Sequence, residues 1–131
     1  MNEKIALTLC PTSNVALKVI QKMDEHPVAK MLDKGILATI HSDDPAYFGG
    51  YMNENYYQTA KALNLSLEQI EQLAINAFEA SWLSKASKER HITQVKEYGI
   101  GKQIKKQLFK LYRSHCNWTV FLNSEQSFMF F

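Results

Sequence analysis

The amino-acid sequence predicts an α/β fold that is built around a parallel strand–helix–strand unit. Two short apolar runs, residues 5–9 and 36–40, have the length and composition of strands that are buried on both faces. A helical pattern lies between them, and this connection is long enough to return the chain so that both strands run in the same direction. The 131 residues match the length of one ordinary domain.

The connection between the two strands contains two predicted helical segments. Residues 12–14 form a turn cluster that offers an N-cap to a helical pattern over residues 15–23. Pro27 stands where the first position of a second helical segment is expected, and Gly35 stands where a C-terminal cap belongs. The second strand follows that glycine directly.

Three further helices are predicted after the second strand. The first covers residues 51–63, and the second begins at a capping box in which Ser66 is followed three residues later by Gln69. Apolar residues at helical spacing extend the second helix to about Trp82, and the third covers residues 84–98. We expect the helices to pack on one side of a small parallel sheet.

The net charge of +2 is divided unevenly along the chain. Residues 1–98 carry ten Lys or Arg and twelve Asp or Glu, whereas residues 99–131 carry five basic residues and one acidic residue. This change predicts two regions, a body of residues 1–98 and a tail of residues 99–131 that is first basic and then aromatic. The basic residues could bind nucleic acid, but a solvated helix face explains them better, so no nucleic-acid partner is predicted.

Composition excludes several classes of protein. With 46% hydrophobic and 21% charged residues the chain is not disordered throughout, and two cysteines are too few for a disulfide scaffold. The sequence contains no apolar run of about eighteen residues and no start resembling a signal peptide. We therefore expect a cytoplasmic protein with no membrane partner.

Asp43 and Asp44 are the first candidate site residues. They follow the second strand and precede Pro45, and ligands bind at the carboxyl ends of parallel strands in α/β folds. Adjacent side chains at a strand end point to opposite sides, so we expect the two carboxylates to have different partners. The alternative is a Ser-Asp-Asp-Pro loop that caps the next helix, and the spacing alone favours this alternative.

Other polar residues near the strand ends carry weaker signals. His41 and Asp43 have a spacing that could bring two metal ligands together, but a catalytic zinc needs about three protein ligands, and a buried, hydrogen-bonded histidine is the simpler interpretation. Cys10 follows the first strand, and a structural thiol is favoured there over a nucleophile. The Gly49-Gly50 pair lacks the spacing of a phosphate-binding loop and indicates close backbone approach or a hinge.

Two separated motifs resemble a known family. The segment Ser-Asp-Asp-Pro-Ala-Tyr-Phe-Gly-Gly-Tyr at residues 42–51, preceded by Cys-Pro-Thr-Ser-Asn-Val at residues 10–15 and by His26-Pro27, is similar to the C-terminal third of adenosine/adenine deaminases. The part after Pro45 looks most like the adenine deaminase branch. The resemblance spans roughly residues 1–98 and does not extend to residues 99–131.

The resemblance implies the C-terminal portion of a (β/α)₈ TIM-type barrel, about two parallel strands with surrounding helices, followed by a tail foreign to the family. It also implies a zinc-dependent hydrolysis in purine salvage that removes the 6-amino group of adenine and gives hypoxanthine and ammonia. In this family Asp43 would be a zinc ligand and Asp44 would bind the purine base. His41 stands where the family more often has Asn, and it receives no such role.

The family's other functional residues have no counterpart in this sequence. A His-x-His pair, a further zinc-binding His, a proton-transferring Glu and another catalytic His would all lie upstream of Met1. One carboxylate does not hold zinc, so we expect no catalytic residue here and no activity from the isolated chain. The alternatives are a fragment of an adenosine deaminase and a truncated, non-enzymatic gene remnant. Unpaired sheet edges in such a piece would favour self-association.

Overall fold

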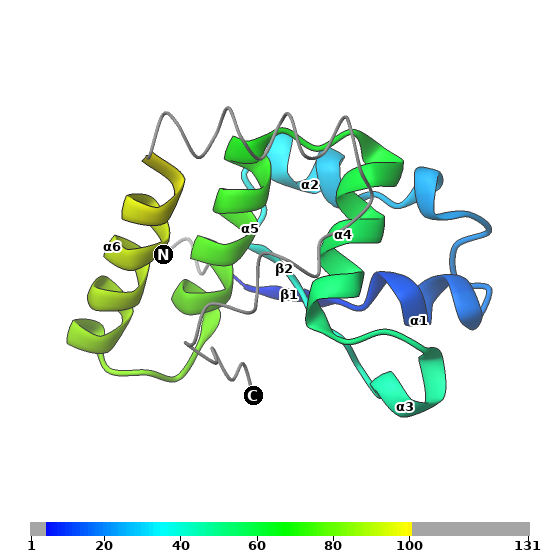
Figure 1. The fold of residues 1–131 in the computed structure, drawn as a ribbon, viewed down its shortest axis with the longest axis horizontal. Coiled ribbons are helices and arrows are strands. Elements are labelled where there is room, and N and C mark those ends of the chain that lie inside the picture. The colour runs from blue at the N-terminus through cyan, green and yellow to red at the C-terminus, as the bar shows by residue number, and fades with distance from the viewer. Residues whose placement is uncertain (1–4, 101–131) are drawn as a thin grey trace.

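The computed structural model describes residues 5–100, with side chains up to Tyr98 (Figure 1). Two strands and a set of helices follow one another in this range: β1 (Leu7–Leu9), α1 (Pro11–Ala16), the 3₁₀ turn η1 (Met23–Glu25), α2 (Val28–Asp33), β2 (Ala38–Ile40), α3 (Pro45–Phe48), α4 (Met52–Leu63), α5 (Leu67–Ala80) and α6 (Lys85–Ile100). No helix in this part of the chain has both the length and the apolar character that crossing a membrane requires.

The two strands form a parallel pair, as predicted. Leu7 lies opposite Ala38 and Leu9 lies opposite Ile40. The pair is closed at one end by the Leu7 N–H bonded to the Leu37 carbonyl at 2.8 Å, and at the other end by the His41 N–H bonded to the Leu9 carbonyl at 2.8 Å. Because the strands are in register, the loops that follow them leave the sheet at the same edge.

The core lies on one face of β2. Its fully buried members come from α2, β2 and α5, and partly buried side chains of β1 and α4 pack against them: Val28, Ala38, Ile40 and Leu73, with Leu9, Tyr56 and Leu63 around them. Helices α2, α4 and α5 therefore cover the face to which Ala38 and Ile40 point, as expected for these three helices (Figure 1). Thr39 points to the opposite face, since side chains alternate along a strand.

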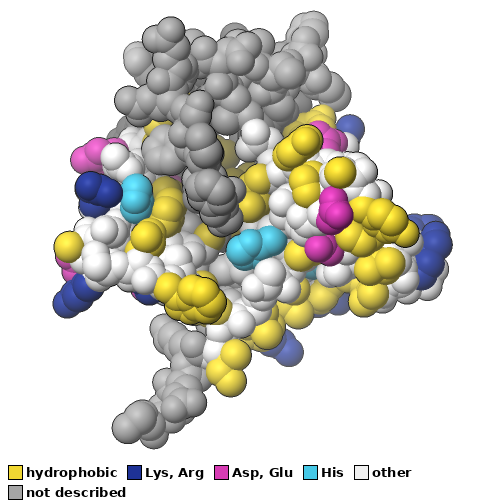
Figure 2. All heavy atoms as spheres, turned by 90° about the horizontal axis from the view of Figure 1, so that it is seen from below, with side chains coloured by type: hydrophobic (Ala, Val, Ile, Leu, Met, Phe, Trp, Pro, Cys, Tyr) yellow, Lys and Arg dark blue, Asp and Glu magenta, His cyan; other side chains and the backbone are white. Residues whose placement is uncertain are grey.

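The expectation that both strands are buried on both faces is wrong for β1. Ala38 and Ile40 are at most 1% exposed, whereas Leu7 is 37% exposed and Ile5 before it is 74% exposed. Within the described range β1 has a neighbouring strand on one side only, and the helices that pack on the sheet contact β2. Other large hydrophobic side chains also reach the surface, and several are visible on the face in Figure 2.

The first predicted helix is displaced in the structure. Helix α1 begins at Pro11, so residues 12–14 lie inside the helix rather than capping a later one. Proline fixes the backbone angle of the first turn, and Lys18, with a φ of +60°, ends the helical path. The N–H groups of Val19 and Ile20 then bond to the Asn14 carbonyl at 2.9 and 3.2 Å. A helix over residues 15–23 is therefore not formed.

The remaining helix signals agree better with the structure. Pro27 caps α2 rather than occupying its first turn, and Gly35 follows the helix with a φ of +70° that suits glycine. The capping box is present, with reciprocal bonds of 3.2 and 3.0 Å between Ser66 and Gln69. The four-residue helix α3 was not predicted.

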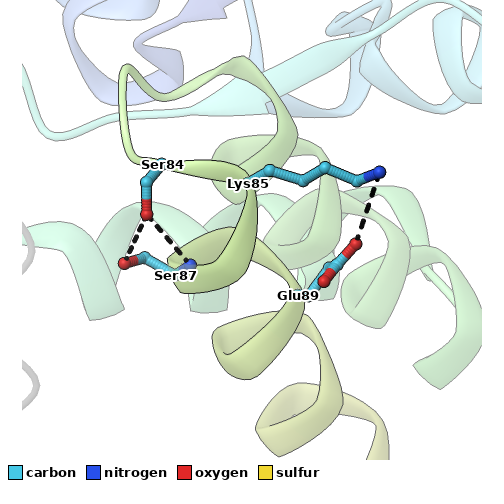
Figure 3. A network of polar contacts seen from close by, with 4 residues as sticks. All are labelled: Ser84, Lys85, Ser87 and Glu89. Atoms are coloured by element: carbon cyan, nitrogen blue, oxygen red, sulfur yellow. Dashed lines mark hydrogen bonds and ion pairs between the residues drawn. The ribbon is translucent and has the colours of Figure 1, made fainter.

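Helix α6 continues past the charge boundary predicted at residue 98. It begins where the Ser84 hydroxyl accepts the Ser87 N–H at 3.3 Å, and an exposed Lys85–Glu89 ion pair at 4.0 Å follows (Figure 3). It ends at Ile100. The division into residues 1–98 and 99–131 stays a prediction, because most of the tail lies outside the described residues.

Candidate functional site

The candidate site lies at the carboxyl ends of β1 and β2. Cys10 follows β1, and residues 41–44 follow β2. Burial raises the pKa of the Cys10 thiol, and the nearby Asp43 carboxylate raises it further, while a hydrogen bond from the Asp43 backbone acts in the opposite direction. The two loops are therefore in direct contact at this edge of the sheet.

Asp43 occupies a left-handed turn. Its φ is +57°, a conformation that costs a residue with a side chain about 1–2 kcal/mol, although Asp tolerates it better than most. The side chain is exposed, and none of the described residues donates a hydrogen bond to its carboxylate. Backbone strain of this kind is concentrated at functional sites. The turn leaves this carboxylate unengaged and accessible.

Asp44 is the N-cap of α3. Its Oδ1 accepts the N–H groups of Ala46 and Tyr47 at 3.0 and 3.1 Å, and Pro45 occupies the first turn. The capping interpretation is therefore correct for this residue. The two neighbouring carboxylates differ in their surroundings because Asp43 occupies a left-handed turn, and not because side chains alternate along an extended strand. That they have different ligands stays a prediction.

His41 is a half-buried, hydrogen-bonded histidine, as the simpler interpretation held. Its Nε2 lies 2.9 Å from the Thr39 hydroxyl, which donates its hydrogen to the Leu7 carbonyl at 3.0 Å. Because a hydroxyl has one hydrogen, His41 must donate from Nε2, which leaves a lone pair on Nδ1. Burial lowers the pKa of His41 and favours this neutral form.

The donor groups at this edge do not make a complete metal site. Among residues 5–100 no three His, Cys, Asp or Glu side chains come together in a way that could hold a metal ion. His41 and Asp43 therefore remain a pair of possible donors without a third. A zinc site requires about three protein ligands, so the residues described here do not fit zinc on their own.

The sequence interpretation missed Asn55. This residue of α4 is fully buried, and its Oδ1 accepts the Thr12 N–H at 3.1 Å. Its Nδ2 donates to the Gly50 and Tyr51 carbonyls at 3.2 Å each. The sequence signal that could have identified it is the spacing of Asn55 and Thr59, two polar residues one turn apart on the same face of a helix. Both side chains are buried in the structure.

His26 has a structural role. It is 3% exposed, its Nδ1 accepts the Val28 N–H at 3.3 Å, and its Nε2 lies 3.3 Å from the Asn14 amide group. Nδ1 thus acts as an acceptor, and the Asn14 amide nitrogen is the atom that lies next to Nε2. The ring thus caps the start of α2 and joins it to α1.

Comparison with known proteins gives this arrangement a family. The sequence model described as Adenosine deaminase matches residues 1–98, which include both strands and the loops that follow them. The chain belongs to the adenosine deaminase family. Its members are deaminases, so the predicted enzyme class is confirmed at the level of the family.

Relatives of this deaminase-family chain include bacterial adenine deaminases. The adenine deaminase of Hahella chejuensis is 49% identical over 98 residues, which are 75% of this chain and 29% of the relative. That of Chlorobium luteolum is 48% identical over 97 residues, which are 74% and 28% of the two chains. The chain therefore spans less than a third of the length of these relatives.

Two solved structures share the fold. The adenine deaminase from Arthrobacter aurescens matches with a TM-score of 0.71 at 40% identity, over 72% of this chain and 29% of that one. Arabidopsis ADAL, solved in complex with IMP, matches with a TM-score of 0.66 at 22% identity, over 73% and 28%. The predicted class, part of a (β/α)₈ barrel with two parallel strands, is confirmed by these barrel enzymes.

Proposed function

We propose that this chain supplies part of an adenine deaminase active site. The reaction is the hydrolytic removal of the 6-amino group of adenine, giving hypoxanthine and ammonia in purine salvage. The observation that carries the proposal is the unengaged Asp43 carboxylate, held in a left-handed turn at the end of a buried parallel strand. The adenine deaminases related to this chain support the choice of substrate.

Asp43 is proposed as one zinc ligand. A carboxylate oxygen is a suitable donor, and this one makes no competing hydrogen bond to the residues that the structure describes. Zinc in hydrolytic sites lowers the pKa of water. Residues 5–100 do not complete such a site, so the other ligands would have to come from outside this range, and no catalytic residue is assigned within it.

Asp44 is proposed to contact the purine base. Its Oδ1 is held by two backbone N–H groups, which fixes the carboxylate and leaves Oδ2 for a ligand. An ionised carboxylate only accepts hydrogen bonds, so it would pair with a ring N–H of the base. Free adenine carries an N–H on its five-membered ring and adenosine does not, which favours adenine over the alternative substrate.

The free edge of β1 offers a place for the missing part. In a parallel strand, successive residues direct their backbone N–H and carbonyl groups to opposite sides. Leu7 and Leu9 bond to β2, so the N–H and carbonyl of Thr8 point away from β2. Thr8 is exposed, and no described strand pairs with this edge. We propose that a strand of a polypeptide carrying the rest of the barrel binds here, and that copies of this chain associate through the same edge in its absence.

Complementation tests the function. The Hahella chejuensis enzyme lacking the region that this chain matches is mixed with the full chain and zinc, and conversion of adenine to hypoxanthine is followed by absorbance. We expect turnover from the mixture and none from either part alone. Asp43→Ala in this chain should reduce turnover by at least about a hundredfold, because a ligand is lost. A mixture that associates but does not deaminate adenine would falsify the proposal, and faster turnover of adenosine would correct the substrate.

A further inference from the structure

We infer that Asn55 is the positioning residue of the candidate site, because its amide joins the loop that follows β1 to the loop that follows β2. The inference rests on the proposed function in one respect, since that function makes these loops an active-site edge. The linkage itself is visible in the structure. Asn55 comes from α4, outside both loops, and would not touch a ligand itself under this assignment.

Every hydrogen-bonding group of the Asn55 side chain is used. The carbonyl oxygen accepts the Thr12 N–H, and the amide nitrogen donates to the Gly50 and Tyr51 carbonyls. The residue is 0% exposed, so none of these groups has water as a substitute. One acceptor and two donors at this length are found together in Asn alone, whereas an ionised Asp keeps the acceptor and loses both donors.

On the β1 side, Asn55 replaces a missing helix cap. Cys10, the N-cap of α1, makes no side-chain bond to the first turn of the helix, which leaves N–H groups there without the usual partner. Asn55 supplies one from another helix by accepting the Thr12 N–H at 3.1 Å. Because Cys10 contacts Asp43, fixing this turn also fixes the neighbourhood of the proposed zinc ligand.

On the β2 side, Asn55 fixes the peptide that follows α3. Gly50 has a φ of +148°, and a Cβ there would lie 3.2 Å from the Glu54 Cγ, so the backbone passes close to α4. The amide of Asn55 holds the Gly50 carbonyl at this point of close approach. Helix α3, which Asp44 caps, is thereby anchored at its far end, so the loop after β1 and the loop after β2 both depend on the Asn55 side chain.

A second buried asparagine provides the control. Asn76 of α5 is 4% exposed, donates to the Ala38 carbonyl at 2.9 Å and accepts from Gln72 at 2.8 Å. Ala38 is the first residue of β2, so Asn76 acts at the opposite end of the sheet from the site. The replacement Asn76→Ala removes a buried amide of the same kind without touching either strand-end loop.

The test compares Asn55→Ala, Asn55→Asp and Asn76→Ala in the full chain. Hydrogen exchange of the Thr12 amide is measured by NMR, and alkylation of Cys10 by iodoacetamide is measured in a Cys116→Ser background. In Asn55→Ala we expect Thr12 exchange to become at least about tenfold faster, because its acceptor is lost. In Asn55→Asp the Thr12 amide should stay protected, since the acceptor remains, while Cys10 alkylation rises because the Gly50 loop is released.

Asn76→Ala should lower the global free energy of unfolding. When it is compared with an Asn55 variant of equal free energy of unfolding, Thr12 exchange and Cys10 alkylation should be unchanged in Asn76→Ala. Equal effects of the Asn55 and Asn76 replacements would overturn the inference, as would loss of Thr12 protection in Asn55→Asp. If Asn55→Ala does not fold, the Asp variant decides. Neither readout requires zinc or adenine, so this inference and the proposed function fail separately: unchanged exchange removes the first, and an inactive complemented complex removes the second.

Discussion

The two strands of the sheet are paired residue by residue and yet have different environments. Ala38 and Ile40 of β2 are almost completely buried, whereas Leu7 of β1, opposite Ala38, is 37% exposed. Both apolar runs are typical of a strand in a parallel sheet. The difference shows that such a pattern reports the environment for which a strand is suited, while its actual burial depends on what lies on either side.

The largest expected effect comes from shortening side chains on the two strands. Ile40→Ala should lower the free energy of unfolding by about 2–5 kcal/mol, because it leaves a cavity beside Val28 and Leu73. Leu7→Ala should cost less than about 1.5 kcal/mol, since its side chain already contacts water. Urea unfolding of both variants measures the difference. Equal losses would mean that β1 is covered in solution.

A partner strand that binds at the free edge of β1 should remove the difference in exposure between β1 and β2. In the isolated chain the Thr8 amide is expected to exchange quickly, because it faces away from β2, whereas the His41 amide is protected by its bond to Leu9. Binding of the truncated Hahella chejuensis enzyme should slow Thr8 exchange by at least about tenfold, as expected for one new buried hydrogen bond. His41 exchange is the internal control. Association without slower Thr8 exchange would place the interface away from this edge.

Local signals in the sequence predicted the parts of the fold that neighbouring residues determine. The capping box at Ser66, the glycine cap at Gly35 and the parallel pairing of two short strands all follow from interactions a few residues long or from the βαβ rule. The position of α1 could not be obtained in this way. Residues 12–14 are suited to capping a helix and also fit inside one, and Pro11 decided the outcome.

The candidate site was predictable only in part. Asp43 and Asp44 follow a strand, and that position identified them, but the left-handed turn that separates their environments depends on the loop as a whole. Asn55 lies more than ten residues from Asp43 in sequence and 43 from Thr12, its partner. No local sequence pattern marks an amide that accepts a hydrogen bond from a backbone group 43 residues away, so the structure was needed to assign Asn55 a role.

The smallest expected effect concerns the crossover that joins the two strands. Burial lowers the pKa of His26 below its ordinary value near 6.5, so the folded chain holds the ring neutral while the unfolded chain takes up a proton as the pH falls. The unfolded state then binds more protons, and stability should decline as the pH falls from about 6.5 toward the lower folded-state pKa, with no change above that window. Protonation would place a hydrogen on Nδ1, which accepts the Val28 N–H, and would loosen the start of α2.

Thermal unfolding between pH 5 and pH 8 measures the effect, with His26→Gln as the comparison. An equally steep decline in that variant would assign it to other groups and leave the crossover without a pH-sensitive contact.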